Sequence, residues 1–256
     1  MSKFNIIVAD PPWGAFSDKL TMSNVKRGAK SNYDVMSTDD IANLDVQRIC
    51  ANNALLALWV PSSLLSDGLK VMERWGFTLK QTWVWVKTKK EPFKKFEHPK
   101  RKDFHLIDSE YDISKFDLKN ALAFGMGRLG RNCHELVIIG IRGKVYKHLK
   151  NKSQRTVFFW PPEKHSKKPE TLQDQLDIMF PSNKLIKIEF FSRRQRSGWW
   201  CIGNEAIMTK NEDIRMSLSK LKTMTTYDMF PINKAISCYD DGKKEILFKM
   251  WGNLSC

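Results

Sequence analysis

The chain has 256 residues, and 43 Lys and Arg against 28 Asp and Glu give it a formal net charge of +15 at pH 7. Its apolar runs are shorter than the roughly 18 residues that span a bilayer, and the first one stops at Asp10, so we expect neither a transmembrane helix nor a signal peptide. Five dispersed cysteines without a Cys-x-x-Cys pair indicate reduced thiols. We therefore expect a soluble intracellular protein of the cytoplasm, or of the host cytoplasm if the chain is viral.

Short apolar runs alternate with amphipathic stretches along the chain, which predicts strands separated by helices. The predicted helices are 38–51 after the N-cap candidate Ser37, 62–75 and 169–180. The predicted strands are 5–9, 55–60, 81–86, 135–141, 155–159, 185–191 and 199–202. Several are apolar on both faces, as in strands covered by helices on both sides. This order predicts an α/β fold, a Rossmann-like sandwich with a mostly parallel central sheet.

Two segments depart from this alternation. Residues from about 87 to 119 form a long, basic insertion, and a loop of that length in a compact α/β domain is functional or disordered. We expect residues 1–206, with this insertion, to form one domain. Residues 207–256 would be a carboxyl-terminal extension, helical to about 221 and ending in a small hairpin around Asp241-Gly242.

The stretch IIVADPPWGAF, residues 6–16, ends an apolar strand on an acid, two prolines and a tryptophan. Ligands of open α/β sheets bind beyond the carboxyl ends of strands, where Asp10 falls. Pro11 and Pro12 stiffen the turn and free the carbonyls of Asp10 and Pro11 from a regular ladder. A fixed carboxylate, fixed carbonyls and the Trp13 ring would receive an exocyclic amine on a flat, stacked ring. The alternative is an ordinary strand-ending turn with a buried Trp.

Asp-Pro-Pro-Trp at the end of a strand resembles the signature of the MT-A70 family of S-adenosylmethionine-dependent adenine-N6 methyltransferases. Other stretches resemble that family in the same order: SNYDVMS, LLALWVPSSLL, QTWVWVKT, GRNCHELVIIGIRG and the long segment from His165 to Glu205. The resemblance extends from Ile6 to about Glu205. It implies a methyltransferase sandwich with permuted motifs, in which the catalytic strand comes first and the cofactor strand late.

The resemblance also implies residues for the cofactor, S-adenosyl-L-methionine, whose product is S-adenosyl-L-homocysteine. The DPPW residues, Asp10, Pro11, Pro12 and Trp13, would form the catalytic motif. Lys168 would pair with the cofactor's carboxylate, and Asp10 would lie near its ammonium group. Other predicted cofactor contacts come from the strand EFFSRR and the turns after it: Glu189, Phe190, Phe191, Arg193, Arg196, Asn204 and Glu205. Ser192 stands where the family usually has Gly or Ala.

Candidate substrate contacts come from two sources. The basic insertion mixes Lys and Arg with Phe, a composition suited to phosphate contacts and base stacking, and a solvated loop is the alternative. The resemblance adds residues of the SNYDVMS and GRNCHE segments, where a structural role for the His-Glu pair is equally open. The full set is Trp13, Tyr33, Lys87, Lys89, Lys90, Lys94, Lys95, Arg131, Asn132 and His134. Five histidines without clustered spacing predict no metal site.

These observations predict an enzyme that methylates N6 of adenine in DNA, because the chain is compact and lacks the zinc fingers and long extensions of RNA-modifying relatives. RNA is the alternative substrate. A non-catalytic nucleic-acid-binding subunit is the alternative from another class, and the intact motifs argue against it. A homodimer or a partner subunit is also left open.

Overall fold

The computed structural model describes residues 3–14, 35–90, 121–125, 130–163, 167–181, 184–237 and 251. Most of the predicted basic insertion lies outside the described residues, as does the predicted hairpin around Asp241-Gly242. The substrate candidates Tyr33, Lys94 and Lys95 also lie outside them. In the described ranges, no helix combines the length and apolar character needed to cross a membrane.

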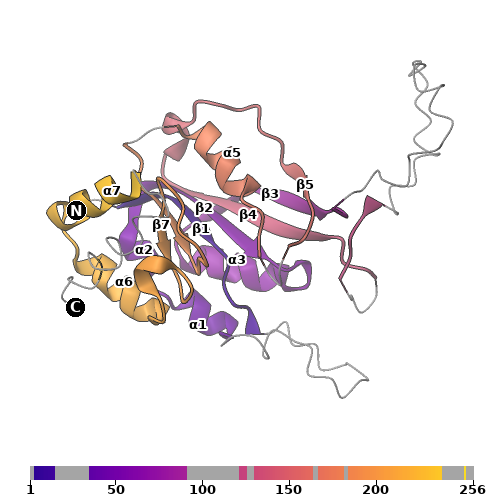
Figure 1. Cartoon of the computed structure of the whole chain (residues 1–256), viewed down its shortest axis with the longest axis horizontal. Coiled ribbons are helices and arrows are strands. Elements are labelled where there is room, and N and C mark those ends of the chain that lie inside the picture. Colours follow the sequence, from indigo (N-terminus) through magenta and orange to yellow (C-terminus); the bar gives the residue numbers. More distant parts are fainter. Residues whose placement is uncertain are drawn as a thin grey trace.

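A seven-stranded sheet runs through the middle of the molecule (Figure 1), in the order β5-β3-β4-β2-β1-β6-β7. Its strands are β1 (Phe4–Ala9), β2 (Cys50–Val60), β3 (Thr78–Lys87), β4 (His134–Arg142), β5 (Val157–Trp160), β6 (Lys187–Phe190) and β7 (Trp200–Ile202). Strand β4 is antiparallel to both neighbours, and all other pairs are parallel. Six strands therefore point one way, which confirms the predicted α/β fold with a mostly parallel sheet.

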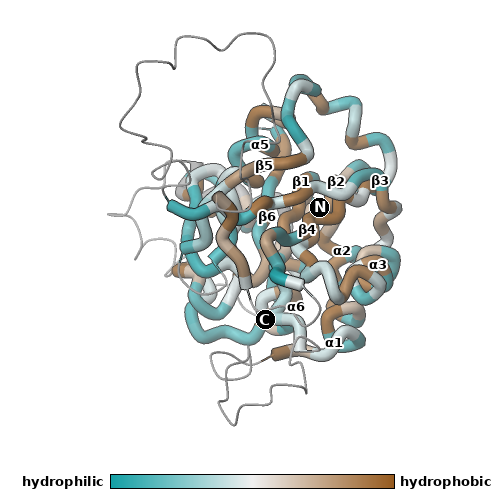
Figure 2. The backbone as a smooth tube through the Cα atoms, turned by 90° about the vertical axis from the view of Figure 1, so that its right-hand side faces the viewer, coloured by the Kyte–Doolittle hydropathy of each residue, from teal (hydrophilic) through white to brown (hydrophobic). Residues whose placement is uncertain are grey.

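Helices cover both faces of this sheet (Figure 1). Helix α5 (Thr171–Met179) lies on one face, and α1 (Thr38–Ala42) and α3 (Leu65–Arg74) lie on the other. The side chains of β1 point alternately to the two faces of the sheet. Ile6 and Val8 pack toward α5, whereas Ile7 and Ala9 pack toward α3. The hydropathy-coloured tube in Figure 2 shows the resulting apolar centre.

The helix predicted for residues 38–51 is interrupted at residues 43–45, and its last two residues belong to a strand. Ser37 does cap α1, accepting a hydrogen bond from the Asp40 N–H, but α1 ends at Ala42. A second short helix, α2, covers Val46–Ile49, and β2 begins at Cys50. Pairing with Phe4 on β1 draws Cys50 into the sheet, so tertiary pairing overrides the local helical pattern.

The predicted carboxyl-terminal helix is η8 (Ile207–Thr209) followed by α6 (Ile214–Thr223), and a further helix, α7 (Thr226–Ser237), was not predicted. Both α6 and α7 contribute buried side chains, including Leu218 and Ile232, to the core on the α3 side. The Trp200 indole N–H on β7 donates to Asn233 Oδ1 of α7 at 2.6 Å. The helices after residue 206 are therefore packed onto the domain that carries the sheet.

Candidate active site

The carboxyl ends of the parallel strands lie along one border of the sheet. The crossover connections change direction there, between the adjacent strands β1 and β6. After β1 the chain crosses to β2 on one side, whereas after β6 it crosses to β7 on the other. Such a switch point is where open α/β sheets bind ligands. Asp10 lies at this point, and its N–H donates to the Phe190 carbonyl at 3.4 Å.

The DPPW turn is held by its own hydrogen bonds and by the tryptophan. The Trp13 N–H donates to the Pro11 carbonyl at 2.9 Å, so this carbonyl, expected to be available to a ligand, is used within the turn. The Trp13 indole N–H donates to the Trp59 carbonyl near the end of β2 at 3.1 Å. Only 5% of Trp13 is exposed. Its ring therefore anchors the turn in this arrangement, and the predicted base stacking stays a prediction.

Asp10 forms an ion pair with Lys168, which precedes α5. The Lys168 ammonium lies 3.0 Å from both Asp10 carboxylate oxygens, 3.3 Å from Glu135 Oε2 and 5.7 Å from the centre of the Trp59 ring. Glu135 Oε1 in turn lies 2.7 Å from the Lys87 ammonium. We call these four side chains, Asp10, Lys168, Glu135 and Lys87, the charged row. It brings together two predicted site residues that are 158 positions apart.

Burial and neighbouring charge shift the pKa values in the charged row. Burial raises the pKa of Asp10 above its ordinary value, and the Lys168 ammonium only partly offsets this. Burial acts in the same direction on Glu135, but Lys168 and Lys87 together outweigh it and lower the Glu135 pKa. The two carboxylates raise the pKa of Lys168 despite its burial. Lys168 and Glu135 are therefore ionised at neutral pH, and Asp10 is the carboxylate nearest to taking up a proton.

The structure places Lys87 differently from its sequence prediction. Lys87 was expected to contact phosphates, but its side chain is only 18% exposed, and its ammonium binds Glu135 and lies 5.2 Å from the Trp85 ring centre. For Glu135, the sequence left open whether the side chain has a structural role or contacts the substrate. In the structure, Glu135 links Lys87 and Lys168. Its only sequence signal is the position after His134 at the start of a strand.

Beside Asp10, the end of β6 carries a second half-buried carboxylate. Glu189 faces Val8 of β1 in the sheet and accepts a hydrogen bond from Gln173 of α5 at 3.0 Å. Burial raises its pKa, and the charge of Asp10 adds to that effect. Phe190 points into the core with 1% exposure, so it supports the strand and presents no surface to a cofactor. Phe191 follows with a left-handed φ of 60° and is half-buried.

The turn after β6 is pressed against the end of β7. The Ser192 N–H donates to the Ile202 carbonyl at 2.9 Å, and a Cβ on Gly203 would lie 2.3 Å from the Ser192 carbonyl oxygen. Only glycine permits this approach. Arg193 Nε lies 3.5 Å from Glu205 Oε1, and Asn204 and Glu205 are exposed beside this turn. These three predicted cofactor residues are thus grouped beyond the ends of β6 and β7.

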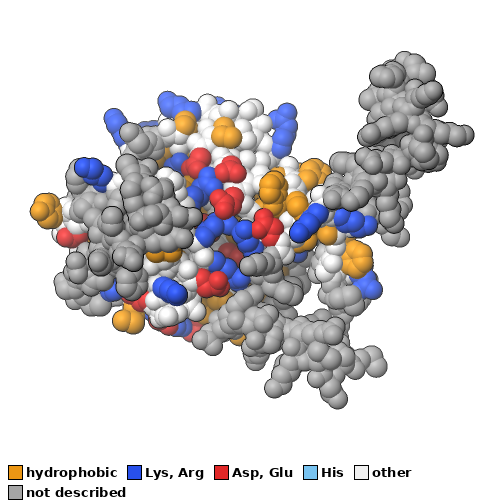
Figure 3. Space-filling view, in the orientation of Figure 1, with side chains coloured by type: hydrophobic (Ala, Val, Ile, Leu, Met, Phe, Trp, Pro, Cys, Tyr) orange, Lys and Arg blue, Asp and Glu red, His pale blue; other side chains and the backbone are white. Residues whose placement is uncertain are grey.

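Arg196 does not belong to this group. Its guanidinium lies 2.8 Å from Glu170, 2.7 Å from Asp174 and 2.9 Å from Asp177, all at or within α5. Three carboxylates bind its two terminal nitrogens, so in this structure Arg196 fastens α5 to the loop after β6, and its predicted ribose contact stays a prediction. Figure 3 shows acidic and basic side chains alternating on the face that carries α5.

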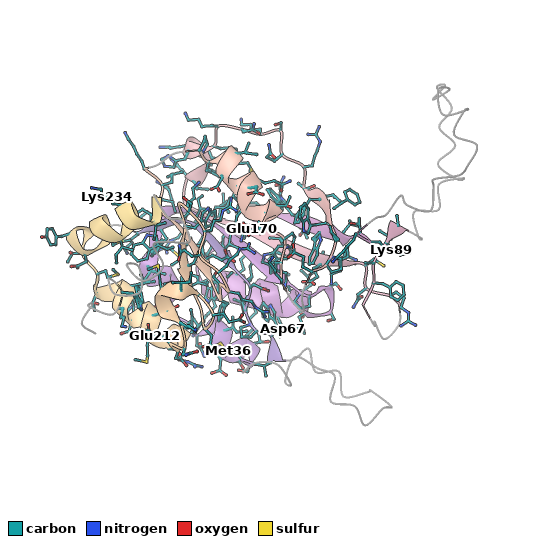
Figure 4. The ribbon with its side chains drawn as sticks, in the orientation of Figure 1. Met36, Asp67, Lys89, Glu170, Glu212 and Lys234 are labelled. Carbon is teal, nitrogen blue, oxygen red and sulfur yellow. The ribbon has the colours of Figure 1, made fainter. Side chains whose placement is uncertain are left out.

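The remaining described substrate candidates lie near the carboxyl end of β3. Lys89, labelled in Figure 4, and Lys90 are exposed just after β3. Arg131 is exposed, with its guanidinium 5.6 Å from the Phe124 ring centre. Asn132 forms a bridge with Gly125, and His134 faces Val86 at the start of β4. They lie near the Lys87–Glu135 end of the charged row, and their contact with substrate stays a prediction.

Comparison with known proteins identifies the family. The MT-A70 family model matches residues 4–106 and 113–205, which include the whole charged row. The chain belongs to the MT-A70 family. This is a family of adenine-N6 methyltransferases, and the resemblance inferred from DPPW and the later motifs is confirmed.

The relatives include a type II methyltransferase, an RNA methyltransferase and a non-catalytic subunit. Type II methyltransferase M.MunI of Mycoplasma sp is 25% identical over 77% of this chain and 75% of its own length. N6-methyladenosine RNA methyltransferase MTA1 of Pyricularia oryzae is 24% identical over 80% of this chain but only 47% of its own length. The N6-adenosine-methyltransferase non-catalytic subunit MTB of Arabidopsis thaliana is 30% identical over 35% of this chain and 11% of its own length.

MT-A70 enzymes use S-adenosyl-L-methionine, and the residues at the switch point fit it. The cofactor supplies an electrophilic methyl group, and it carries a carboxylate, an ammonium group and ribose hydroxyls. The half-buried Lys168 matches the carboxylate, and the half-buried carboxylates of Asp10 and Glu189 match the ammonium and hydroxyl groups. The side-chain-free Gly203 and the exposed Asn204 and Glu205 border the same edge.

Proposed function

We propose that this MT-A70 methyltransferase modifies the N6 amine of adenine in DNA. The observation that carries the proposal is Asp10, a half-buried carboxylate fixed at the switch point and paired with Lys168. RNA remains the alternative substrate, because MTA1 is named as an RNA enzyme.

In this proposal Asp10 orients the nucleophile. Its carboxylate accepts a hydrogen bond from the exocyclic amine and turns the nitrogen lone pair away from conjugation with the ring. Lys168 and the rigid turn built by Pro11 and Pro12 keep the carboxylate in one place, so little reorganisation is needed at the moment of transfer. Asp10 has no need to act as a strong base, because the amine loses its proton during or after transfer and water accepts it.

The preference for DNA rests on how much of each relative's length the chain matches. The match covers three quarters of M.MunI, named as a type II methyltransferase, but less than half of the RNA enzyme MTA1. A net charge of +15 supports a polyanionic substrate of either kind. An adenine in a duplex would have to be flipped out at a cost of a few kcal/mol, which basic residues such as Lys89, Lys90 and Arg131 would help to offset.

The test is transfer from methyl-labelled S-adenosyl-L-methionine to duplex DNA, single-stranded DNA and RNA of mixed sequence, with the products digested and analysed for N6-methylated adenine nucleosides. We expect label in the deoxynucleoside, and none with Asp10→Asn. Label confined to RNA would overturn the choice of DNA. Cofactor binding without label in any substrate would point to a missing partner subunit or a narrow sequence context. Neither binding nor label would favour a non-catalytic subunit.

A further inference from the structure

Glu135 contacts two different lysines, one with each of its carboxylate oxygens. Oε1 lies 2.7 Å from the Lys87 ammonium and Oε2 lies 3.3 Å from the Lys168 ammonium. The three side chains are 15 to 21% exposed, so solvent screens these contacts less than it screens a surface pair. Glu135 therefore contributes to the electrostatic environment of the switch point without adjoining Asp10 directly.

The backbone holds Glu135 firmly. It is the second residue of β4 and faces Trp85 of β3 in the sheet. The Lys87 N–H donates to the Cys133 carbonyl at 2.7 Å, two residues before Glu135. Because β4 is antiparallel, its first residues lie among the last residues of β3 and β2. The sheet thus fixes both ends of the Glu135–Lys87 pair.

Lys168, in contrast, is on a loop and carries its charge on a flexible four-carbon stem. Among the described residues, its carboxylate partners are Asp10 and Glu135. Asp10 has a second task in the proposed mechanism, since its carboxylate must face the adenine amine. A lysine held only by Asp10 would compete with that amine for the carboxylate. Glu135 offers Lys168 a second partner that has no other task toward the substrate.

We propose that Glu135 is a positioning residue of this methyltransferase, which holds the Lys168 ammonium at the switch point for the cofactor's carboxylate and is itself fixed by Lys87. In this arrangement Lys168 stays in place when Asp10 turns to its ligand. Glu135 touches neither cofactor nor substrate and acts only through Lys168 and through its charge.

The charge of Glu135 has a further effect on Asp10. The charged groups that face Asp10 are Lys168 before α5, Arg193 after β6, Glu135 on β4 and Glu189 on β6. Burial is the main cause of the raised Asp10 pKa, Lys168 and Arg193 lower it, and Glu135 raises it. Replacing Glu135 with neutral Gln therefore lowers the Asp10 pKa, which moves the acid limb of any Asp10-dependent property to lower pH. Loosened packing alone would not produce that direction.

The decisive variant is Glu135→Gln, studied through binding of S-adenosyl-L-homocysteine by calorimetry, which is independent of the nucleic acid that the enzyme modifies. We expect about tenfold weaker binding at pH 7, an acid limb shifted to lower pH, and an unchanged Tm within a few degrees. In steady state, KM for the cofactor should rise more than kcat falls. The matched control is Glu163→Gln, which removes the carboxylate paired with Lys167, the residue next to Lys168, and should bind as the parent does.

A double-mutant cycle separates positioning from a general structural effect. In the Lys168→Met background, Glu135→Gln should weaken binding no further, because Glu135 acts through Lys168. Additive losses, an unshifted acid limb, or equal effects of Glu135→Gln and Glu163→Gln would each overturn the proposal. If Glu135→Gln fails to fold, Lys87→Met replaces it. This variant removes the residue that fixes Glu135 and should weaken binding about threefold, whereas parental affinity would refute the assigned role.

Discussion

Two networks of charged side chains lie on the α5 side of the sheet, and they are built from the same kinds of group. In the charged row, Asp10, Glu135, Lys87 and Lys168 come from β1, β4, β3 and the loop before α5. In the second network, which we call the α5 clamp, Arg196 meets Glu170, Asp174 and Asp177 of one helix.

The difference teaches how location gives similar ion pairs different roles. The α5 clamp surrounds one cation with three carboxylates at and within one helix, which suits an anchor. The charged row alternates acids and bases along the edge where parallel strands end, and one of its acids is desolvated at the switch point. Residue type alone did not distinguish them, since Arg196 was predicted from the sequence to bind cofactor.

The largest effect should follow from removing the acid of the charged row. Asp10→Asn keeps the side-chain shape but loses the negative charge, so we expect methyl transfer to fall by at least about 100-fold. Because burial raises the Asp10 pKa, ionised Asp10 works against folding at neutral pH, and the variant should keep or exceed the parental Tm. Transfer assays and thermal unfolding check both statements. If the variant retained turnover, the charged row would have no catalytic role that distinguishes it from the α5 clamp.

The converse experiment is Arg196→Met in the α5 clamp. Removing the cation leaves three carboxylates facing one another, which should lower the free energy of unfolding by about 2 to 3 kcal/mol, less than for a fully buried pair because the acids are partly exposed. Urea denaturation measures the loss, with Arg196→Lys as a control that keeps the charge. Affinity of the folded variant for S-adenosyl-L-homocysteine should stay near the parental value. A selective loss of affinity would restore the predicted cofactor role of Arg196.

The pH dependence should also separate binding from stability. Burial raises the pKa of Asp10 above its ordinary value of 3.8, so cofactor binding should weaken as the pH falls toward that raised pKa. Glu135 has a lowered folded-state pKa, so its stabilisation is complete above its ordinary value of 4.5 and is lost only as pH falls through the lower folded value. Binding should therefore fail at a higher pH than folding. Calorimetry and circular dichroism across the same buffers measure the two, and simultaneous loss would contradict the assignment.

The smallest effect concerns the anchor of the DPPW turn. Trp13→Phe removes the indole N–H that reaches the Trp59 carbonyl and leaves a small void, which should cost about 1 to 2 kcal/mol of unfolding free energy. Methyl transfer should fall only modestly if Trp13 is an anchor. A severe loss of transfer with little loss of stability would instead favour the stacking role predicted from the sequence.

Much of the fold could be predicted from the sequence, because each strand is a short apolar run between turn residues. The exceptions have physical causes. The helix predicted for residues 38–51 stops at Ile49 because Cys50 pairs with β1, which no local pattern records. Helix α7 was missed although Thr225 and Asp228 exchange the hydrogen bonds of a capping box before it.

The candidate site was only partly predictable. The positions of Asp10 and Lys168 followed from the resemblance to MT-A70 enzymes, and the structure shows them in contact. The role of Glu135 depends on the direction of β4, because an antiparallel strand brings its first residues to the edge where the other strands end. Strand direction is a long-range property, so Glu135 could not be joined to Lys168 from the sequence alone.

The place of β1 in the sheet has a consequence for how the chain can be made. Strand β1 is synthesised first, but its neighbour β6 begins only at Lys187. At typical translation rates the open edge of β1 waits on the order of 10 to 40 s for its partner. A nascent or truncated chain that ends before Lys187 exposes an unpaired, apolar strand edge prone to aggregation. We therefore expect that the residues before Lys187 do not form an independent folding unit.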